Sequence, residues 1–278
     1  MTDWLHDQFA AEPFGIMGWL RVILRGSVLG VLVCLGLLLL LLVRLVERPL
    51  FGLARPWTPH ITRVVCRAAF PVLSMGYAVR GRPMVGRGAI VANHASGMDI
   101  LALNAAQSLY FVAKSEVAGW AGIGWLGRAT GTVFIARKGT EAKAQQGVFE
   151  DRLRAGHRLA FFPEGTSTDG QRVLPFKSTL FAAFYSHGVD HIMQIQPVSL
   201  RYHAPEGRDP RFYGWWGDMD FASHLLQVLA CRRPGRVEVT FHDPVPVDAF
   251  GDRKLLAAHC EAVVRGGLAI SPTGQAGS

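Results

Sequence analysis

Residues 89–99 read AIVANHASGMD, an apolar run that breaks into polar residues at Asn93. A short apolar run that ends in turn-forming residues predicts a buried strand, and the residues after Asp99 predict a helix. Residues 158–168 (RLAFFPEGTST) repeat the pattern, because a second apolar run ends in a Pro-Glu-Gly turn. Two such units indicate an α/β fold, in which polar residues at the carboxyl ends of strands carry the chemistry.

The alternation continues on both sides of these two segments, from Gly76 onward. Strands are predicted at Tyr77–Arg80, Ala89–Ala92, Leu109–Ala113, Thr132–Ile135, Arg158–Phe162, Gln194–Tyr202 and Arg236–Phe241. Helices are predicted at Ile100–Gln107, Glu141–Ala155, Thr179–His187, Phe221–Ala230 and Lys254–Arg265. This order predicts an α/β domain over residues 76–268, with a mixed, largely parallel sheet covered by helices. We expect residues 269–278 to form a disordered tail.

Residues 1–75 predict a membrane anchor. Gly26–Val43 (GSVLGVLVCLGLLLLLLV) has no charge over 18 residues, and such a helix is about 27 Å long, close to the roughly 30 Å hydrocarbon core. Asp3, Asp7 and the lack of a small-residue cleavage site argue against a cleaved signal peptide. The length leaves a single pass and a re-entrant or monotopic helix open. Ile61–Met75, interrupted by charges and a proline, predicts an interfacial helix.

The charge pattern indicates orientation and partners. Two arginines precede the apolar run and five follow it: Arg21 and Arg25, then Arg44, Arg48, Arg55, Arg63 and Arg67. This excess predicts that the bulk of the protein faces the cytoplasm from a cell membrane, which we expect to be a bacterial inner membrane. The net charge of +8 favours an anionic partner, either nucleic acid or an anionic membrane or substrate. Basic residues are scattered, and the longest run is Arg232–Arg233, so membrane lipids are expected as partners and nucleic acid is not.

His94 and Asp99 are the first candidates for chemistry. A carboxylate five residues after a histidine can accept a hydrogen bond from Nδ1 and leave Nε2 free to take a proton from a hydroxyl or thiol. The alternative for this segment alone is a turn histidine, with Asp99 as a helix N-cap. No HxxxH or HExxH spacing lies nearby, so no metal site is expected. The four cysteines form no CxxC pair, which argues against a disulfide framework or a zinc site.

Further candidates lie at the other strand ends. Gly165 permits close backbone approach to an anion or oxyanion, and Glu164 can accept from a ligand hydroxyl. Lys114 and Arg137 follow strands, where a cation suits an anionic head group. A plain turn and plain surface charges are the respective alternatives.

Trp120 and Trp125 stand among glycines. They are expected either to line an acyl tunnel or enter the membrane interface, or to be core aromatics.

Taken together, these segments resemble the lysophospholipid acyltransferases of the 1-acylglycerol-3-phosphate acyltransferase type. The family's Asn-His-x4-Asp block matches residues 93–99, and its Phe-Pro-Glu-Gly-Thr block matches residues 162–166. A strand that ends in arginine matches residues 134–137, and an apolar strand with a proline matches residues 195–199. Leu-Pro-Phe-Lys at residues 174–177 matches a further recurring stretch. The blocks occur in the family's order and imply its glycerolipid-acyltransferase fold.

The resemblance implies a mechanism and a set of partners. His94 is the general base, Asp99 orients it, and the acceptor hydroxyl attacks an acyl thioester carried on acyl carrier protein or coenzyme A. Backbone amides around Gly165 are expected to stabilise the oxyanion. The residues expected to hold the lysolipid acceptor are Lys114, Arg137, Glu164, Gly165 and Thr166. No covalent acyl-enzyme, metal or bound cofactor is implied.

The acceptor stays open at this level. Residues 212–221 (FYGWWGDMDF) lie outside the shared blocks, and their Trp-Gly-Asp core resembles a bacterial branch that includes lyso-ornithine lipid acyltransferases. Ala121 stands where the family often has proline, which changes the expected loop shape. Lysophosphatidic acid is therefore the first expectation and a lyso-aminolipid the second. A non-enzymatic membrane scaffold is the alternative from another class, and a hydrolase is disfavoured because no Gly-x-Ser-x-Gly elbow is present.

Overall fold

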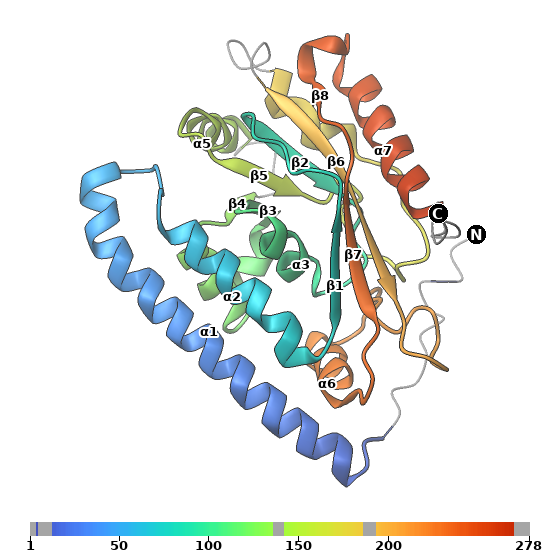
Figure 1. The fold of residues 1–278 in the computed structure, drawn as a ribbon. Helices are drawn as coiled ribbons and strands as arrows, with labels where there is room; N and C mark the ends of the chain where they lie inside the picture. Colours follow the sequence, from blue (N-terminus) through green and yellow to red (C-terminus); the bar gives the residue numbers. More distant parts are fainter. Residues whose placement is uncertain (1–3, 5–12, 136–141, 186–192, 270–278) are drawn as a thin grey trace, which may run out of the picture.

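The computed structural model describes Trp4 and residues 13–135, 142–185 and 193–269. These residues form one twisted sheet with helices on both faces, and a long helix lies outside one of the helical layers (Figure 1). The strands are β1 (Gly76–Arg80), β2 (Gly88–Ala92), β3 (Tyr110–Lys114), β4 (Val133–Ile135), β5 (Arg158–Phe161), β6 (Gln194–His203), β7 (Arg236–Phe241) and β8 (Val245–Pro246). All seven strands predicted from the sequence are confirmed within one or two residues, and β8 is an addition.

The sheet is mixed and largely parallel, as predicted. Its strand order is β1-β7-β6-β2-β5-β3-β4, and β8 pairs with β6. Strands β6, β2, β5, β3 and β4 are parallel to their neighbours within that series, whereas β7 is antiparallel to β6. Val91 of β2 lies opposite Phe161 of β5. The segments that follow these two strands therefore leave the sheet side by side, at its carboxyl edge.

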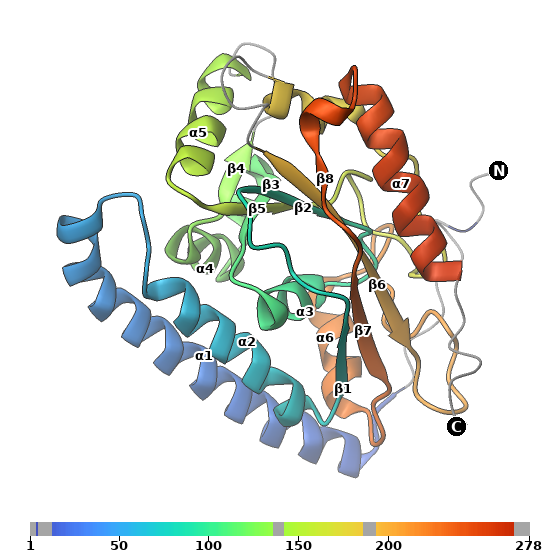
Figure 2. The ribbon, with the colours of Figure 1, turned by 45° about the horizontal axis from the view of Figure 1, so that its top comes forward.

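The central strand β2 is apolar throughout because both of its faces are covered. Ile90 and Ala92 belong to the core beneath α2, α3 and α6, and Ala89 and Val91 belong to the core beneath α5 and α7. Figure 2 shows the two helical layers on either side of the sheet. This double burial fixes where β2 ends, since the first polar side chain, Asn93, directly follows the buried run.

The helices of the domain mostly follow the sequence prediction. They are α3 (Asp99–Ala106), α4 (Ile123–Thr130), α5 (Ala142–Arg154), α6 (Phe221–Ala230) and α7 (Arg253–Ala269), with 3₁₀ segments η2 (Ser115–Gly119), η4 (Ser178–Tyr185) and η6 (Val247–Ala249). Two elements differ from the prediction. Helix α4 was not predicted because its glycines hide the helical pattern. The helix predicted from Thr179 is a 3₁₀ segment over its described residues.

The N-terminal helix α1 (Ile16–Phe51) has 36 residues, twice the predicted apolar run. It is about 54 Å long and is the one described helix long and apolar enough to cross a membrane. Helix α2 (Thr58–Leu73) begins three residues before the predicted interfacial helix and runs alongside α1 (Figure 1). Only Val22, Leu40 and Glu47 of α1 are buried, so most of its apolar side chains are exposed.

Contacts hold α1 to the domain along its whole length. Near its start, the Arg25 guanidinium donates to the carbonyl of Leu229 in α6 (3.0 Å). In its middle, Gly36 lies so close to Val65 of α2 that a Cβ at Gly36 would be 2.3 Å from a Val65 methyl. Near its end, the buried Glu47 carboxylate accepts from the amide (3.0 Å) and the hydroxyl (2.7 Å) of Thr58, at the start of α2.

Candidate active site

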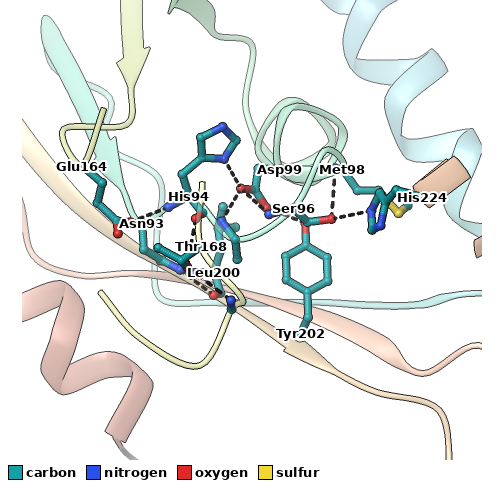
Figure 3. A network of polar contacts seen from close by, with 12 residues as sticks. Asn93, His94, Ser96, Met98, Asp99, Glu164, Thr168, Leu200, Tyr202 and His224 are labelled. Atoms are coloured by element: carbon teal, nitrogen blue, oxygen red, sulfur yellow. Dashed lines mark hydrogen bonds and ion pairs between the residues drawn. The ribbon is translucent and has the colours of Figure 1, made fainter. Parts of the chain in front are cut away.

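His94 lies at the carboxyl end of β2, and Asp99 is the first residue of α3. The turn between them brings Nδ1 of His94 to 2.7 Å from Oδ2 of Asp99 (Figure 3). Because an ionised carboxylate only accepts hydrogen bonds, the shared proton is on Nδ1 and Nε2 is left as an acceptor. The side chain of His94 is 21% exposed, and Nε2 has no hydrogen-bond partner among the residues that the structure describes.

The alternative prediction for this segment, Asp99 as a helix N-cap, is wrong. The N-cap of α3 is Met98, which makes no side-chain cap bond. Asp99 is fully buried, and its Oδ2 accepts from the amides of Ala95 (2.8 Å) and Ser96 (3.0 Å) as well as from His94. These three donors hold the carboxylate in one orientation.

Tyr202, on β6, supplies a fourth donor to Asp99. Its hydroxyl donates to Oδ1 of Asp99 at 2.7 Å. Burial and the neighbouring Asp99 carboxylate raise the pKa of Tyr202 well above its ordinary value, so the phenol stays protonated and donates. No pattern in the sequence indicates Tyr202, because it is 103 residues from Asp99 and only the pairing of β6 with β2 brings the two together.

Behind Asp99, the polar network continues to α6. Ser96 is buried, its Oγ accepts from the amide of Met98 (3.2 Å), and it lies 3.4 Å from Nε2 of His224. Burial lowers the pKa of His224 to about 4, so this ring is neutral near pH 7. The dyad therefore rests on neutral hydrogen-bonding groups rather than on a second charge.

Glu164 makes contacts that the sequence did not indicate. Its Oε1 accepts from the amide of His94 (2.7 Å) and its Oε2 accepts from the amide of Leu174 (2.6 Å). The residue is 2% exposed, and both oxygens hold main chain rather than a ligand. Burial raises the pKa of Glu164 to about 7, and the two amides and nearby Asp99 change it less.

Two further segments hold the backbone beside His94. The amide and the hydroxyl of Thr168 both donate to the carbonyl of His94, at 2.8 and 3.2 Å. The amide of Trp215 donates to the carbonyl of Ala95 at 3.1 Å. The ring of Phe162 stacks on the imidazole of His94, with centroids 4.1 Å apart. The position of the His94 imidazole is thus fixed by the hydrogen bonds of its main chain, by stacking on Phe162 and by the hydrogen bond to Asp99.

Gly165 adopts a positive φ of 75° in the turn after β5, a conformation that favours glycine. Its amide donates to the carbonyl of Phe162 (3.1 Å), so in this structure that N–H is engaged within the turn rather than open to an oxyanion. Lys177 covers the same turn, since a Cβ at Gly165 would lie 2.5 Å from its Nζ. The sequence indicated the stretch containing Lys177 but gave this lysine no role.

The remaining predicted site residues fall into two groups. Lys114 ends β3 and Thr166 is exposed in the loop after β5, so both lie at the carboxyl edge with His94. Arg137 lies outside the described residues. Trp120 is 42% exposed and Trp125 is 53% exposed, so the alternative that they are core aromatics is wrong.

Residues 212–221 form part of the wall beside the dyad. The rings of Trp215 and Trp120 are 6.0 Å apart, and those of Trp215 and Phe221 are 5.5 Å apart. Gly97, in the turn between His94 and Asp99, lies so near Phe221 that a Cβ there would be 2.4 Å from the ring. The segment outside the shared sequence blocks therefore packs directly on the dyad turn.

Comparisons with known proteins agree with this geometry. A family model described as Acyltransferase matches residues 78–201, which include both His94 and Glu164. The chain is 59% identical over 266 residues to the lyso-ornithine lipid O-acyltransferase of Rhodobacter capsulatus, covering 95% of this chain and 96% of that protein. It is 33% identical over 145 residues to the 1-acyl-sn-glycerol-3-phosphate acyltransferase of Neisseria gonorrhoeae, covering 51% and 55%.

The fold also matches a solved structure. The 1-acyl-sn-glycerophosphate (LPA) acyltransferase of Thermotoga maritima aligns with a TM-score of 0.64 at 22% identity, over 91% of this chain and 96% of that one. At this identity the likeness concerns the fold. The family model and the Rhodobacter relative, which matches nearly end to end, show that the chain is an acyltransferase that acts on lysolipids, a member of the lysophospholipid acyltransferase family.

Proposed function

We propose that this enzyme transfers a fatty acyl group to the free hydroxyl of a lyso-ornithine lipid. The observation that carries the proposal is the 59% identity to a lyso-ornithine lipid O-acyltransferase over 96% of that protein's length. The relative that acts on 1-acyl-sn-glycerol-3-phosphate matches at 33% over 55% of its length. This reverses the order expected from the sequence, in which lysophosphatidic acid came first and the lyso-aminolipid second.

The position of residues 212–221 supports the same acceptor. This segment, whose Trp-Gly-Asp core distinguishes the chain from the shared blocks, packs on the turn between His94 and Asp99 through Trp215 and Phe221. An acceptor bound at His94 would meet this aromatic wall. Ornithine offers a carboxylate and an amine where a lysophosphatidic acid offers a phosphate, so a different wall is expected for a different head group.

In the proposed reaction, Nε2 of His94 takes the proton of the acceptor hydroxyl as its oxygen attacks the thioester carbonyl. The carbon–sulfur bond then breaks, and the thiolate leaves with the proton that His94 returns. Asp99 stabilises the imidazolium between these steps. Acyl carrier protein or coenzyme A carries the donor, and no bound cofactor takes part.

The head-group contacts are proposed from their places at the carboxyl edge. Lys114 and Thr166 lie there, Lys177 adds a cation over the Gly165 turn, and Arg137 remains a predicted contact. Glu164 is proposed to position His94 through its amide instead of touching the acceptor. The negative charge of the ornithine carboxylate and of the oxyanion favours cations at this edge.

We propose that α1 holds the enzyme on the membrane as a monotopic element rather than crossing it. Its contacts with α6 and α2 extend from Arg25 to Glu47, so lipid cannot surround it as it would surround a spanning helix. Its outward face, from Ile16 to Phe51, is lined with exposed apolar side chains. Such a face suits burial in the interfacial layer of one leaflet, and the proposed location is a bacterial inner membrane with the domain in the cytoplasm.

A direct assay tests the acceptor. Purified enzyme is given one acyl thioester donor and either lyso-ornithine lipid or lysophosphatidic acid, and kcat/KM is measured for each. We expect lyso-ornithine lipid to be preferred at least tenfold, and equal or better use of lysophosphatidic acid would overturn the proposal.

His94→Ala should lower kcat by several orders of magnitude with either acceptor while the protein stays folded. An active His94→Ala variant would rule out the proposed base.

A further inference from the structure

A second site lies at the opposite edge of the sheet from His94. A pocket of about 590 Å³ opens at the amino ends of β2, β3 and β5. One wall is formed by Tyr110 and Arg158, the first residues of β3 and β5, and by Met84 in the connection before β2. The other wall is the end of α1 and the start of α2. The full length of β2 separates this pocket from the dyad, so it plays no part in the acyl-transfer chemistry described above.

The pocket is basic. Arg55, His60, Arg63, His157 and Arg158 line it, and none of the residues that line it is acidic. The carboxylate of Glu47, near the end of α1, is already engaged by Thr58, Trp57 and Arg44. The cations of the pocket therefore face no carboxylate on its wall, and an anion entering it gains favourable electrostatic energy.

Two polar atoms on the pocket wall are buried without a partner among the described residues. The guanidinium of Arg55 donates through one terminal nitrogen to the carbonyl of Ala129 (3.1 Å), but its Nε has no acceptor. Gln107 donates through Nε2 to the carbonyl of Met84 (2.7 Å), and its Oε1 has no donor. Buried polar groups are nearly always paired, and here one donor and one acceptor on residues of the pocket wall are left unpaired.

Hydrogen bonds and ring stacking hold the wall together around His157. His157 is buried, and its burial, with Arg152 and Arg55 nearby, lowers its pKa to about 4. The neutral ring donates from Nε2 to the carbonyl of Leu53 (2.9 Å) and accepts at Nδ1 from Arg152 (3.3 Å). Its face stacks on Tyr110, with centroids 4.0 Å apart. The α1–α2 turn is thereby fixed to the start of β5, which holds Arg55 in place.

The rim of the pocket is apolar. Phe51 and Val85 line the pocket and are exposed, Val85 to 87%. Leu53 and Trp57, which neighbour lining residues in the chain, are exposed as well. A soluble anion would make no apolar contacts with this rim. A lipid can place its head group in the basic pocket and its acyl chains against the apolar rim. Phe51 also ends the helix that we propose to lie in the membrane interface.

We propose that this pocket binds the phosphate of an anionic membrane phospholipid, with Arg55 and Arg63 as its ligands and Gln107 as the acceptor for a head-group hydroxyl. Phosphatidylglycerol has this combination of groups. The proposal goes beyond the acyl-transfer reaction and rests on the membrane-surface position proposed for α1. It assigns the amino edge of the sheet to membrane recognition and leaves the carboxyl edge to catalysis.

The test measures binding of the full chain to vesicles of phosphatidylcholine with and without phosphatidylglycerol. Arg63→Gln and the double variant Arg55→Gln/Arg63→Gln are compared with Arg67→Gln. Arg67 is exposed one turn further along α2 and does not line the pocket, so it controls for general surface charge. Each pocket arginine is expected to contribute about fivefold to phosphatidylglycerol binding, and Arg67→Gln is expected to change it less than twofold.

The outcomes separate the explanations. Equal losses of phosphatidylglycerol binding in all three variants, or no loss in the pocket variants, would overturn the proposal that this pocket binds the lipid. Competition by millimolar inorganic phosphate that removes the phosphatidylglycerol preference would show a free-phosphate site and overturn the lipid assignment. A melting temperature for each variant shows whether it is folded, and Arg63→Gln serves alone if the double variant is not. His94→Ala should bind vesicles like the native chain, so failure of the catalytic proposal is seen independently.

Discussion

The Asp99 carboxylate accepts four hydrogen bonds, which together fix its orientation toward His94. Two come from amides of its own turn, one from His94, and one from Tyr202 on a strand far away in sequence. The spacing of His94 and Asp99 made their contact predictable, because five residues span one tight turn. Tyr202 and the amide contact of Glu164 were not predictable, because they depend on which strands lie beside β2.

Tyr202→Phe is predicted to lower kcat by about tenfold or more, since a hydrogen bond to a charged group is worth about 1.5–3 kcal/mol. The change removes the donor to Oδ1 of Asp99 and the side-chain hydrogen bond between Tyr202 and Ser96. KM for the acceptor should change little, because Tyr202 is buried behind Asp99. Tyr213→Phe, which removes a hydroxyl that accepts from Gly235, is the matched control, and similar rates for both variants would argue against a positioning role for Tyr202.

Glu164 is predicted to make the free energy of unfolding depend on pH. Its carboxyl has an ordinary pKa near 4.5 and a pKa of about 7 in the folded enzyme. Between these values the folded state binds the extra proton, so the stability that this group contributes is complete below pH 4.5 and is lost as pH rises through 7. The loss is about 3 kcal/mol for a shift of this size. Glu164→Gln should lack this fall in the free energy of unfolding, and chemical denaturation of both proteins at pH 5 and pH 8 measures the difference.

At the scale of elements, the sequence predicted strands better than helices. The strands are apolar runs buried on both faces, and that signal is local. Helix α4 was not predicted, because it lies in a glycine-rich stretch. The segment from Ser178 was predicted as an α-helix from its apolar pattern, but it is a 3₁₀ segment. The true length of α1 and its docking to α2 depend on a contact between two helices, which no pattern within either helix reveals.

Gly36 and Gly30 test that docking. Gly36→Leu places a side chain where Val65 of α2 now lies, and Gly30→Leu points into open space on the same helix. Overpacking of this kind costs about 1–3 kcal/mol, so Gly36→Leu should lower the melting temperature in detergent by several degrees. Gly30→Leu should leave it nearly unchanged. Equal melting temperatures would mean that α1 is not held against α2 in solution.

At the scale of the whole molecule, the position of α1 decides on which side of the membrane the N-terminus lies. A single-pass helix separates the two ends of the chain, whereas a monotopic helix keeps both on one side, which is the cytoplasmic side in the location proposed above. Reporter fusions at each end, active only in the cytoplasm, are predicted to be active at both. Activity at the C-terminal end alone would favour a single pass and contradict the arrangement of α1 along α2 and α6.

The hydrogen bonds around His94 also set the order in which a newly made chain becomes an enzyme. The dyad turn needs Glu164, Tyr202 and Trp215, which the ribosome adds 70, 108 and 121 positions after His94. Helix α1 precedes all of them and can reach the bilayer while synthesis continues. The chain is therefore expected to arrive at the membrane surface before it can transfer an acyl group, so that its first turnover takes place where its lipid substrate is.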